Sequence, residues 1–71
     1  MNEKNHRRSA EWPPLWGALA DACGGPRSLA AELKKHYQTV WRWALRGWPV
    51  PPLETQAIRD LALKKHVRSP V

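Results

Sequence analysis

The chain has 71 residues, and its 12 Lys and Arg against 6 Asp and Glu give a formal charge of +6 at pH 7. This length suffices for one small domain, and the positive charge favours an anionic partner, either nucleic acid or an acidic membrane surface. The single cysteine excludes an internal disulfide framework, and no apolar run has the length of a membrane span or a signal peptide, so we expect an intracellular protein.

Residues 1–11 are polar and without periodicity, and we expect them to form a flexible N-terminal arm. The first predicted helix begins at Pro13 and Pro14, because proline lacks the N–H that a first helical turn leaves unpaired. Gly24 and Gly25 end this helix. Its apolar residues recur at helical spacing: Leu15, Trp16, Leu19, Ala22 and Cys23.

Two further helices are predicted in the middle of the chain. The second begins at Pro26, ends near Lys34 and carries an apolar stripe of Leu29, Ala30 and Leu33. The third covers about Tyr37 to Arg46, and Gly47 is well placed as the left-handed residue beyond its end.

Residues 48–52, WPVPP, are incompatible with a helix or a central strand because of their prolines. A fourth predicted helix follows and ends before Ser69 and Pro70, which leaves residues 69–71 as a C-terminal tail. One face of this helix carries Leu53, Ala57, Ile58, Leu61 and Ala62. Since no β-strand pattern is found, we expect an all-α fold of four to five short helices within residues 12–68.

The stretch QTVWRWALRG, residues 38–47, contains two tryptophans that one helix cannot both turn into its core. At about 100° per residue, Val40 and Trp43 share the core face, whereas Trp41 falls at its border. The opposite face carries Gln38, Arg42 and Leu45. Because the chain has no Phe, the other large aromatic positions are expected in the core or at its edge: Trp12, Trp16, Trp43 and Trp48.

Enzyme activity has no support in the sequence, which lacks paired carboxylates, a nucleophile with a base, and a phosphate-binding loop. The histidines His6, His36 and His66 are 30 residues apart, so we expect no metal site, and no cofactor or small-molecule ligand is predicted. Cys23 is expected to be a small buried or half-buried hydrophobe rather than a nucleophile.

Two short helices joined by about three residues are typical of a helix-turn-helix. LAAELKKHYQTVWRW, residues 29–43, followed by LRGWPVPP, resembles the Cro and CI repressor family of temperate phages and the related YdaS-type antitoxins. The resemblance covers residues 15 to about 62 and implies a lambda-repressor-like domain. The matching positions are Gly24 and Gly25, Leu29 and Ala30, Val40 and Trp43, Gly47, and Val50 to Pro52.

This resemblance implies that residues 37–46 form a recognition helix in the major groove of double-stranded DNA. Gln38 is the candidate for bidentate contact with adenine and Arg42 for guanine, with Tyr37, Trp41 and His36 as further base contacts. The candidate phosphate contacts are Arg27, Ser28, Lys34, Lys35 and Arg46.

The predicted turn departs from the family's pattern, in which a glycine precedes an aliphatic residue. This chain has Lys34 and Lys35 there. A lysine in the left-handed conformation costs roughly 1 kcal/mol, and Lys35 leaves an apolar position unfilled unless its aliphatic stem covers it.

The expected function is that of a Cro-type transcriptional repressor in the cytoplasm of a bacterial or phage-infected cell. It would bind operator DNA as a homodimer and block a promoter. A YdaS-like antitoxin, with a protein partner at the first or fourth helix, is the alternative within this family. An alternative of another class is a cationic membrane-active peptide, although separate apolar stripes interrupted by seven prolines favour a folded core.

Overall fold

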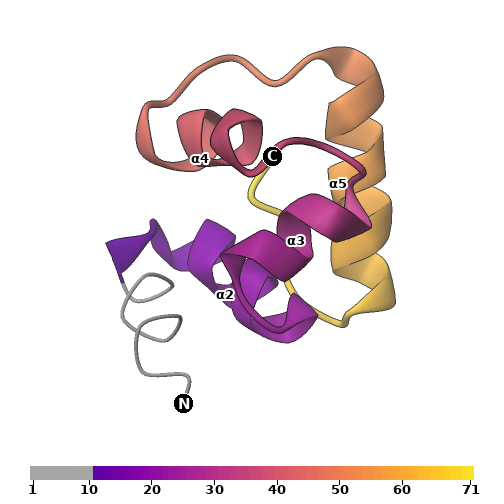
Figure 1. Ribbon diagram of the computed structural model, residues 1–71. Helices are drawn as coiled ribbons and strands as arrows, with labels where there is room; N and C mark the ends of the chain where they lie inside the picture. Colours follow the sequence, from indigo (N-terminus) through magenta and orange to yellow (C-terminus); the bar gives the residue numbers. More distant parts are fainter. Residues whose placement is uncertain (1–10) are drawn as a thin grey trace.

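Four helices, joined by short turns and one proline-rich link, make up the fold of residues 11–71, the part of the chain that the computed structural model describes (Figure 1). The helices are α2 (Pro14–Cys23), α3 (Pro26–Glu32), α4 (Tyr37–Leu45) and α5 (Pro52–Lys64). No strand occurs among these residues, so the prediction of an all-α, helix-turn-helix-like domain is confirmed. Apart from Glu11, the arm predicted at residues 1–11 lies outside the described residues.

Proline begins three of the four helices of residues 11–71, at the position that best tolerates its missing N–H. Pro14, Pro26 and Pro52 each occupy the first helical position of α2, α3 and α5. A missing N–H costs nothing there, because the first turn has no acceptor for it, and the fixed φ of proline suits the helix. The sequence predicts the starts of α2 and α3 at these prolines, whereas Pro52, which was assigned to the non-helical link, instead begins α5.

Helix α3 lies at the centre of the fold and packs against both α2 and α4, while α5 runs along the side of this group (Figure 1). Val40 is fully buried and Trp43 is 7 % exposed, so α4 turns the predicted face inward. The core consists of Trp12, Trp16, Leu19, Ala20, Leu29, Ala30, Val40, Trp43, Ala44, Ile58, Leu61 and Ala62.

The turn between α3 and α4 reverses through a left-handed lysine. Lys34 has φ 56°, its N–H donates to the carbonyl of Ala31 at 3.1 Å, and the N–H of Lys35 donates to that of Ala30 at 3.0 Å. This pair of bonds is a Schellman motif, which normally has glycine at the left-handed position. As a result α3 ends at Glu32, two residues earlier than the sequence predicts.

The same motif corrects the end of the fourth helix. His66 has φ 61°, and the N–H of Val67 donates to the carbonyl of Ala62 at 3.0 Å, so α5 ends at Lys64 rather than just before Ser69. The chain then turns back, and Val67 and Val71 pack against the core. Residues 69–71, expected as a tail, are therefore part of the packed structure.

The inward face of α5 also differs from the prediction. Leu53 is 83 % exposed and Ala57 is exposed, whereas Glu54 and Thr55 are half-buried. Thr55 donates from its hydroxyl to the carbonyl of Val50 at 3.3 Å, and Glu54 pairs with Lys35 of the α3–α4 turn. Ile58, Leu61 and Ala62 are buried as predicted, while the first turn makes two polar contacts that an apolar periodicity does not reveal.

Replacing Lys34 with glycine is expected to raise the free energy of unfolding by about 1 kcal/mol, because glycine adopts the left-handed conformation without the penalty of a side chain. Urea denaturation measures the change. Lys34→Ala is the matched control, since it removes the same charge but retains a Cβ. Equal stability of the two variants would contradict a strained turn at this position.

Candidate nucleic-acid interface

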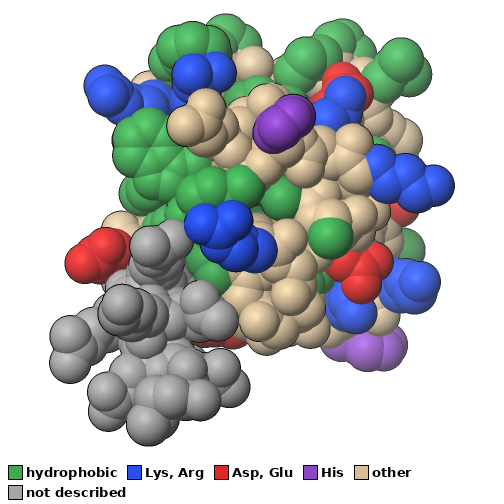
Figure 2. Space-filling model, viewed as in Figure 1, with side chains coloured by type: hydrophobic (Ala, Val, Ile, Leu, Met, Phe, Trp, Pro, Cys, Tyr) green, Lys and Arg blue, Asp and Glu red, His purple; other side chains and the backbone are tan. Residues whose placement is uncertain are grey.

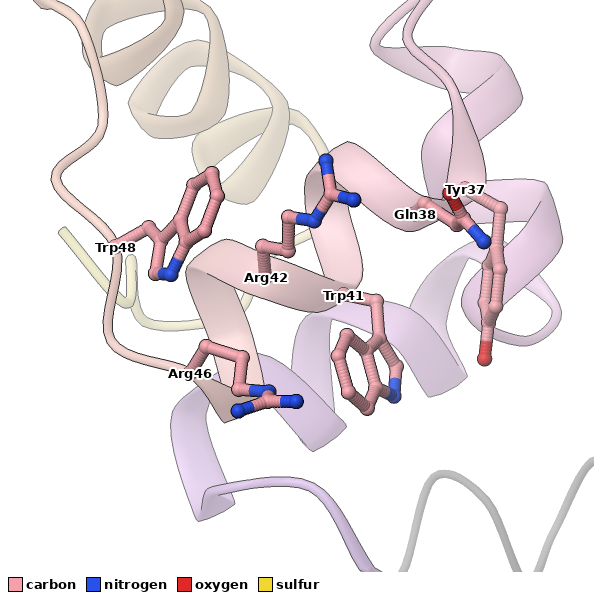
Figure 3. A pocket seen from close by; sticks show the side chains of 6 residues that line it. All are labelled: Tyr37, Gln38, Trp41, Arg42, Arg46 and Trp48. Carbon is pink, nitrogen blue, oxygen red and sulfur yellow. The ribbon is translucent and has the colours of Figure 1, made fainter.

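The exposed side of α4 forms one wall of an open groove of about 460 Å³. This side is exposed because Val40, Trp43 and Ala44 occupy the buried one. Six side chains line the groove: Tyr37, Gln38, Trp41, Arg42, Arg46 and Trp48 (Figure 3). Five of them come from α4 or its C-terminal cap, and Trp48 comes from the link that follows.

Two arginines of this groove each lie over a tryptophan ring. The Cζ atom of Arg42 is 5.0 Å from the centroid of the Trp48 ring, and that of Arg46 is 5.4 Å from the centroid of the Trp41 ring. Cation–π contacts of this kind order a guanidinium without neutralising it. Neither arginine forms an ion pair with a carboxylate of residues 11–71, so the groove retains both positive charges.

A third arginine makes a similar contact beside the groove. The Cζ atom of Arg27, on α3, is 4.9 Å from the centroid of the Tyr37 ring. Tyr37 borders both the groove and a second, more open depression of about 500 Å³ over the α3–α4 turn. The other residues around that depression are Arg27, Ala30, Ala31, Lys34, Lys35 and His36.

Around α4, at the upper left of Figure 2, Lys and Arg side chains lie beside hydrophobic ones rather than beside acidic ones. A surface that combines ordered cations with aromatic and amide groups is suited to an anionic ligand that also presents flat or hydrogen-bonding groups. Nucleic acid has both properties.

The structure brings together four of the five predicted base contacts, since Tyr37, Gln38, Trp41 and Arg42 line the same groove. His36 is exposed just before α4 and borders the second depression instead. Trp41 is half-buried against the core, as its border position predicts.

The predicted phosphate contacts do not form one cluster. Arg46 lines the groove, while Arg27 and Lys34 border the second depression. Ser28 is half-buried in a separate hollow beside Cys23. The Nζ atom of Lys35 lies 2.8 Å from the Oε2 atom of Glu54, so its charge is already paired.

Trp48 is the groove residue whose role the sequence did not reveal. It was expected in the core or at its edge, but its side chain is 53 % exposed. Gly47, with φ 68°, is the left-handed residue beyond the end of α4, as predicted, and the exposed Pro49 follows Trp48. A tryptophan between a helix-ending glycine and a proline cannot continue the buried stripe of the helix. This position in the sequence was the signal that Trp48 is exposed.

Two ionisable groups near the α3–α4 turn have shifted pKa values. The hydrogen bond from Lys35, aided by its charge and opposed by partial burial, lowers the pKa of Glu54 below its ordinary value of 4.5. Burial raises the pKa of the half-buried Cys23 thiol, against the opposing charge of Lys65. Cys23 is thus a thiol at neutral pH, as expected of a structural cysteine.

In comparisons with known protein families, curated proteins and solved structures, nothing matches this chain. None of the helices in residues 11–71 combines the length and apolar character needed to cross a membrane. The same residues contain no cluster of three or more His, Cys, Asp or Glu that could hold a metal ion.

The Lys35–Glu54 pair makes the stability of the turn depend on pH. A lowered pKa means that the pair stabilises the fold above the ordinary pKa of Glu54 and that this stabilisation is lost as the pH falls through the lowered value. In Lys35→Met, NMR titration of the Glu54 carboxyl should give a higher pKa than in the parent protein. Lys34→Met removes a neighbouring charge without the hydrogen bond and should leave that pKa nearly unchanged; an equal rise in both variants would contradict a specific pair.

Proposed function

We propose that this protein is a sequence-specific double-stranded DNA-binding repressor of the Cro type, with α4 as its recognition helix. The observation that carries the proposal is the composition of the exposed face of α4, where Gln38 and Arg42 line one groove. Glutamine and arginine are the residues whose side chains make bidentate contacts with adenine and guanine in the major groove.

The spacing of these two residues suits base pairs about two steps apart in a duplex. Gln38 and Arg42 are four residues apart, hence about 6 Å along the helix axis and on one face. Base pairs of a duplex follow each other at about 3.4 Å. The two side chains therefore reach base pairs about two steps apart, without bending of either the helix or the DNA.

The helix-turn-helix arrangement supports the same function. Helix α3 packs across α4 and holds Arg27 and the turn lysine Lys34 beside its N-terminal end, while Arg46 lies at its C-terminal end. Cations on both sides of a recognition helix neutralise phosphates of the two strands that border the major groove. Binding of this kind across a promoter would block transcription.

Two copies of the chain on one operator are part of this proposal. Leu63, on the outer side of α5, is 77 % exposed, and a contact between copies would cover it. Sedimentation of the protein–operator complex at saturation measures the number of subunits, and we expect two per operator.

The proposal predicts binding to duplex DNA that weakens steeply with salt. The logarithm of affinity should fall by about 0.9 per phosphate contact for each unit of the logarithm of salt concentration. Lys34→Ala should flatten this slope by about one unit, whereas Lys35→Ala should flatten it less, because Glu54 already pairs with Lys35. Fluorescence anisotropy of a labelled duplex over a salt series gives both slopes.

Equal slopes in the parent and the Lys34→Ala protein would exclude Lys34 from the interface. Anionic phospholipid vesicles serve as the competing target in the same buffers. Binding to vesicles together with no binding to duplexes would contradict the proposal and favour a membrane-active protein.

The two tryptophans of α4 should respond differently to truncation. Trp43→Ala removes a buried ring and is expected to cost on the order of 3–5 kcal/mol, which unfolds a domain of this size. Trp41→Ala removes a half-buried ring from the groove, and we expect a folded protein that loses about 1 kcal/mol of stability and about tenfold in DNA affinity.

Thermal melting followed by circular dichroism establishes the fold of each variant before binding is measured. A Trp41→Ala protein that melts like Trp43→Ala would place Trp41 in the core. A folded Trp41→Ala protein that binds DNA as tightly as the parent would exclude this ring from recognition.

A further inference from the structure

The link after α4 contributes one large side chain to the groove, and this side chain touches the arginine assigned to guanine. Trp48 lies outside the helix, yet its ring stands beside the Arg42 guanidinium across the groove from Gln38 and Tyr37 (Figure 3). An indole that is 53 % exposed contributes little to the core. Its ring is instead available for contacts at the surface, among them the one with Arg42.

Trp48 contacts Arg42 through both its backbone and its side chain. The backbone N–H of Trp48 donates to the carbonyl of Arg42 at 3.2 Å, and the Arg42 Cζ atom lies 5.0 Å from the centroid of the indole ring. Gly47 makes this double contact feasible, because its left-handed φ of 68° folds the link back over the last turn of α4. A Cβ at Gly47 would meet nothing within 4 Å, so the conformation, not the available space, requires glycine there.

Such a contact matters for bidentate readout by arginine. A free arginine side chain samples many rotamers, and ordering it on binding costs entropy. Contact with the face of an indole restricts the guanidinium while leaving its N–H groups available to acceptors. The arginine is then ordered before it meets a guanine.

We propose that Trp48 is a specificity-determining residue of the DNA-binding surface, which acts by holding the Arg42 guanidinium in position to read one guanine. This inference rests on the proposed function. It assigns to Trp48 a positioning role and to Arg42 the base contact.

The second arginine–tryptophan pair does not have the same arrangement. Arg46 and Trp41 both belong to α4 or its cap, and Trp41 is half-buried against the core. Arg46 follows the last helical turn, where a phosphate contact is the expected role. Of these two pairs, only Arg42–Trp48 connects the last turn of α4 to a residue outside the helix and its cap.

The test uses a pool of random duplexes, from which the parent protein selects bound sequences. The selected sequences define the preferred base at each position, and single-base variants of the best duplex give the affinity ratio for guanine over the other bases. We expect Trp48→Ala to reduce this ratio about fivefold or more at one position and to leave the other positions unchanged. Arg42→Ala should lose the preference at that same position.

Three comparisons distinguish positioning from other roles. Trp48→Phe retains an aromatic face and should restore most of the guanine preference. Trp48→Leu retains apolar volume without that face and should behave like Trp48→Ala, so it carries the test if the alanine variant is poorly folded. Leu53→Ala, which removes another exposed apolar side chain near the link, should change neither preference nor salt dependence.

Each contrary outcome has a separate meaning. A folded Trp48→Leu protein with the guanine preference of the parent would overturn this inference and leave the proposed function standing. A uniform loss of affinity for all duplexes would overturn it as well, because Trp48 would then contact the DNA backbone. Failure of the parent protein to select any sequence from the pool would overturn the proposed function and this inference with it.

Discussion

Burial of Val40 and Trp43 fixes the rotation of α4 about its own axis, and the rest of the structure depends on that orientation. A helix of nine residues is not stable alone in water, so its conformation depends on the contacts that these two side chains make with the core. Once they face inward, the residues half a turn away must face solvent. The exposed positions of Gln38 and Arg42 are therefore a consequence of core packing rather than an independent feature of the surface.

Short connections let so small a chain close this core. Left-handed residues follow α2, α3, α4 and α5, at Gly24, Lys34, Gly47 and His66. At two of these positions the chain has a side chain that disfavours the conformation. The gain from returning the chain to the core outweighs that cost, as the burial of Val40 after Lys34 and the packing of Val67 after His66 indicate.

Five cations of residues 11–71 fall into two groups with different electrostatic consequences. Lys35 and Lys65 lie near carboxylates, at 2.8 Å from Glu54 and 3.8 Å from Glu32, and connect the α3 region to α5. The three arginines of the candidate interface instead lie over aromatic rings: Arg27, Arg42 and Arg46. Ion pairs thus neutralise the charges of Lys35 and Lys65, while cation–π contacts order three arginines and leave their positive charges available to an anionic partner.

The sequence by itself determined the all-α class, the starts of α2, α3 and α4, the inward face of α4 and four of the six side chains of the groove. These features depend on local chemistry: proline at a first helical turn, glycine beyond a helix end, and a helical period that separates Val40 and Trp43 from Gln38 and Arg42. Arg46 also lines the groove, although its expected role was a phosphate contact.

Only the tertiary structure decided that Trp48 contacts Arg42, how α5 is rotated and where that helix ends. Each of these depends on a partner distant along the chain or on a backbone conformation that the residue type does not predict. Glu54 pairs with Lys35 of another segment, and His66 has a left-handed φ just before Val67, which packs against the core. A hydrophobic side chain at the right period indicates that a residue can be buried, but whether it is buried depends on what the rest of the fold places against it. Leu53 and Trp48 remain exposed because nothing in the described chain covers more of them.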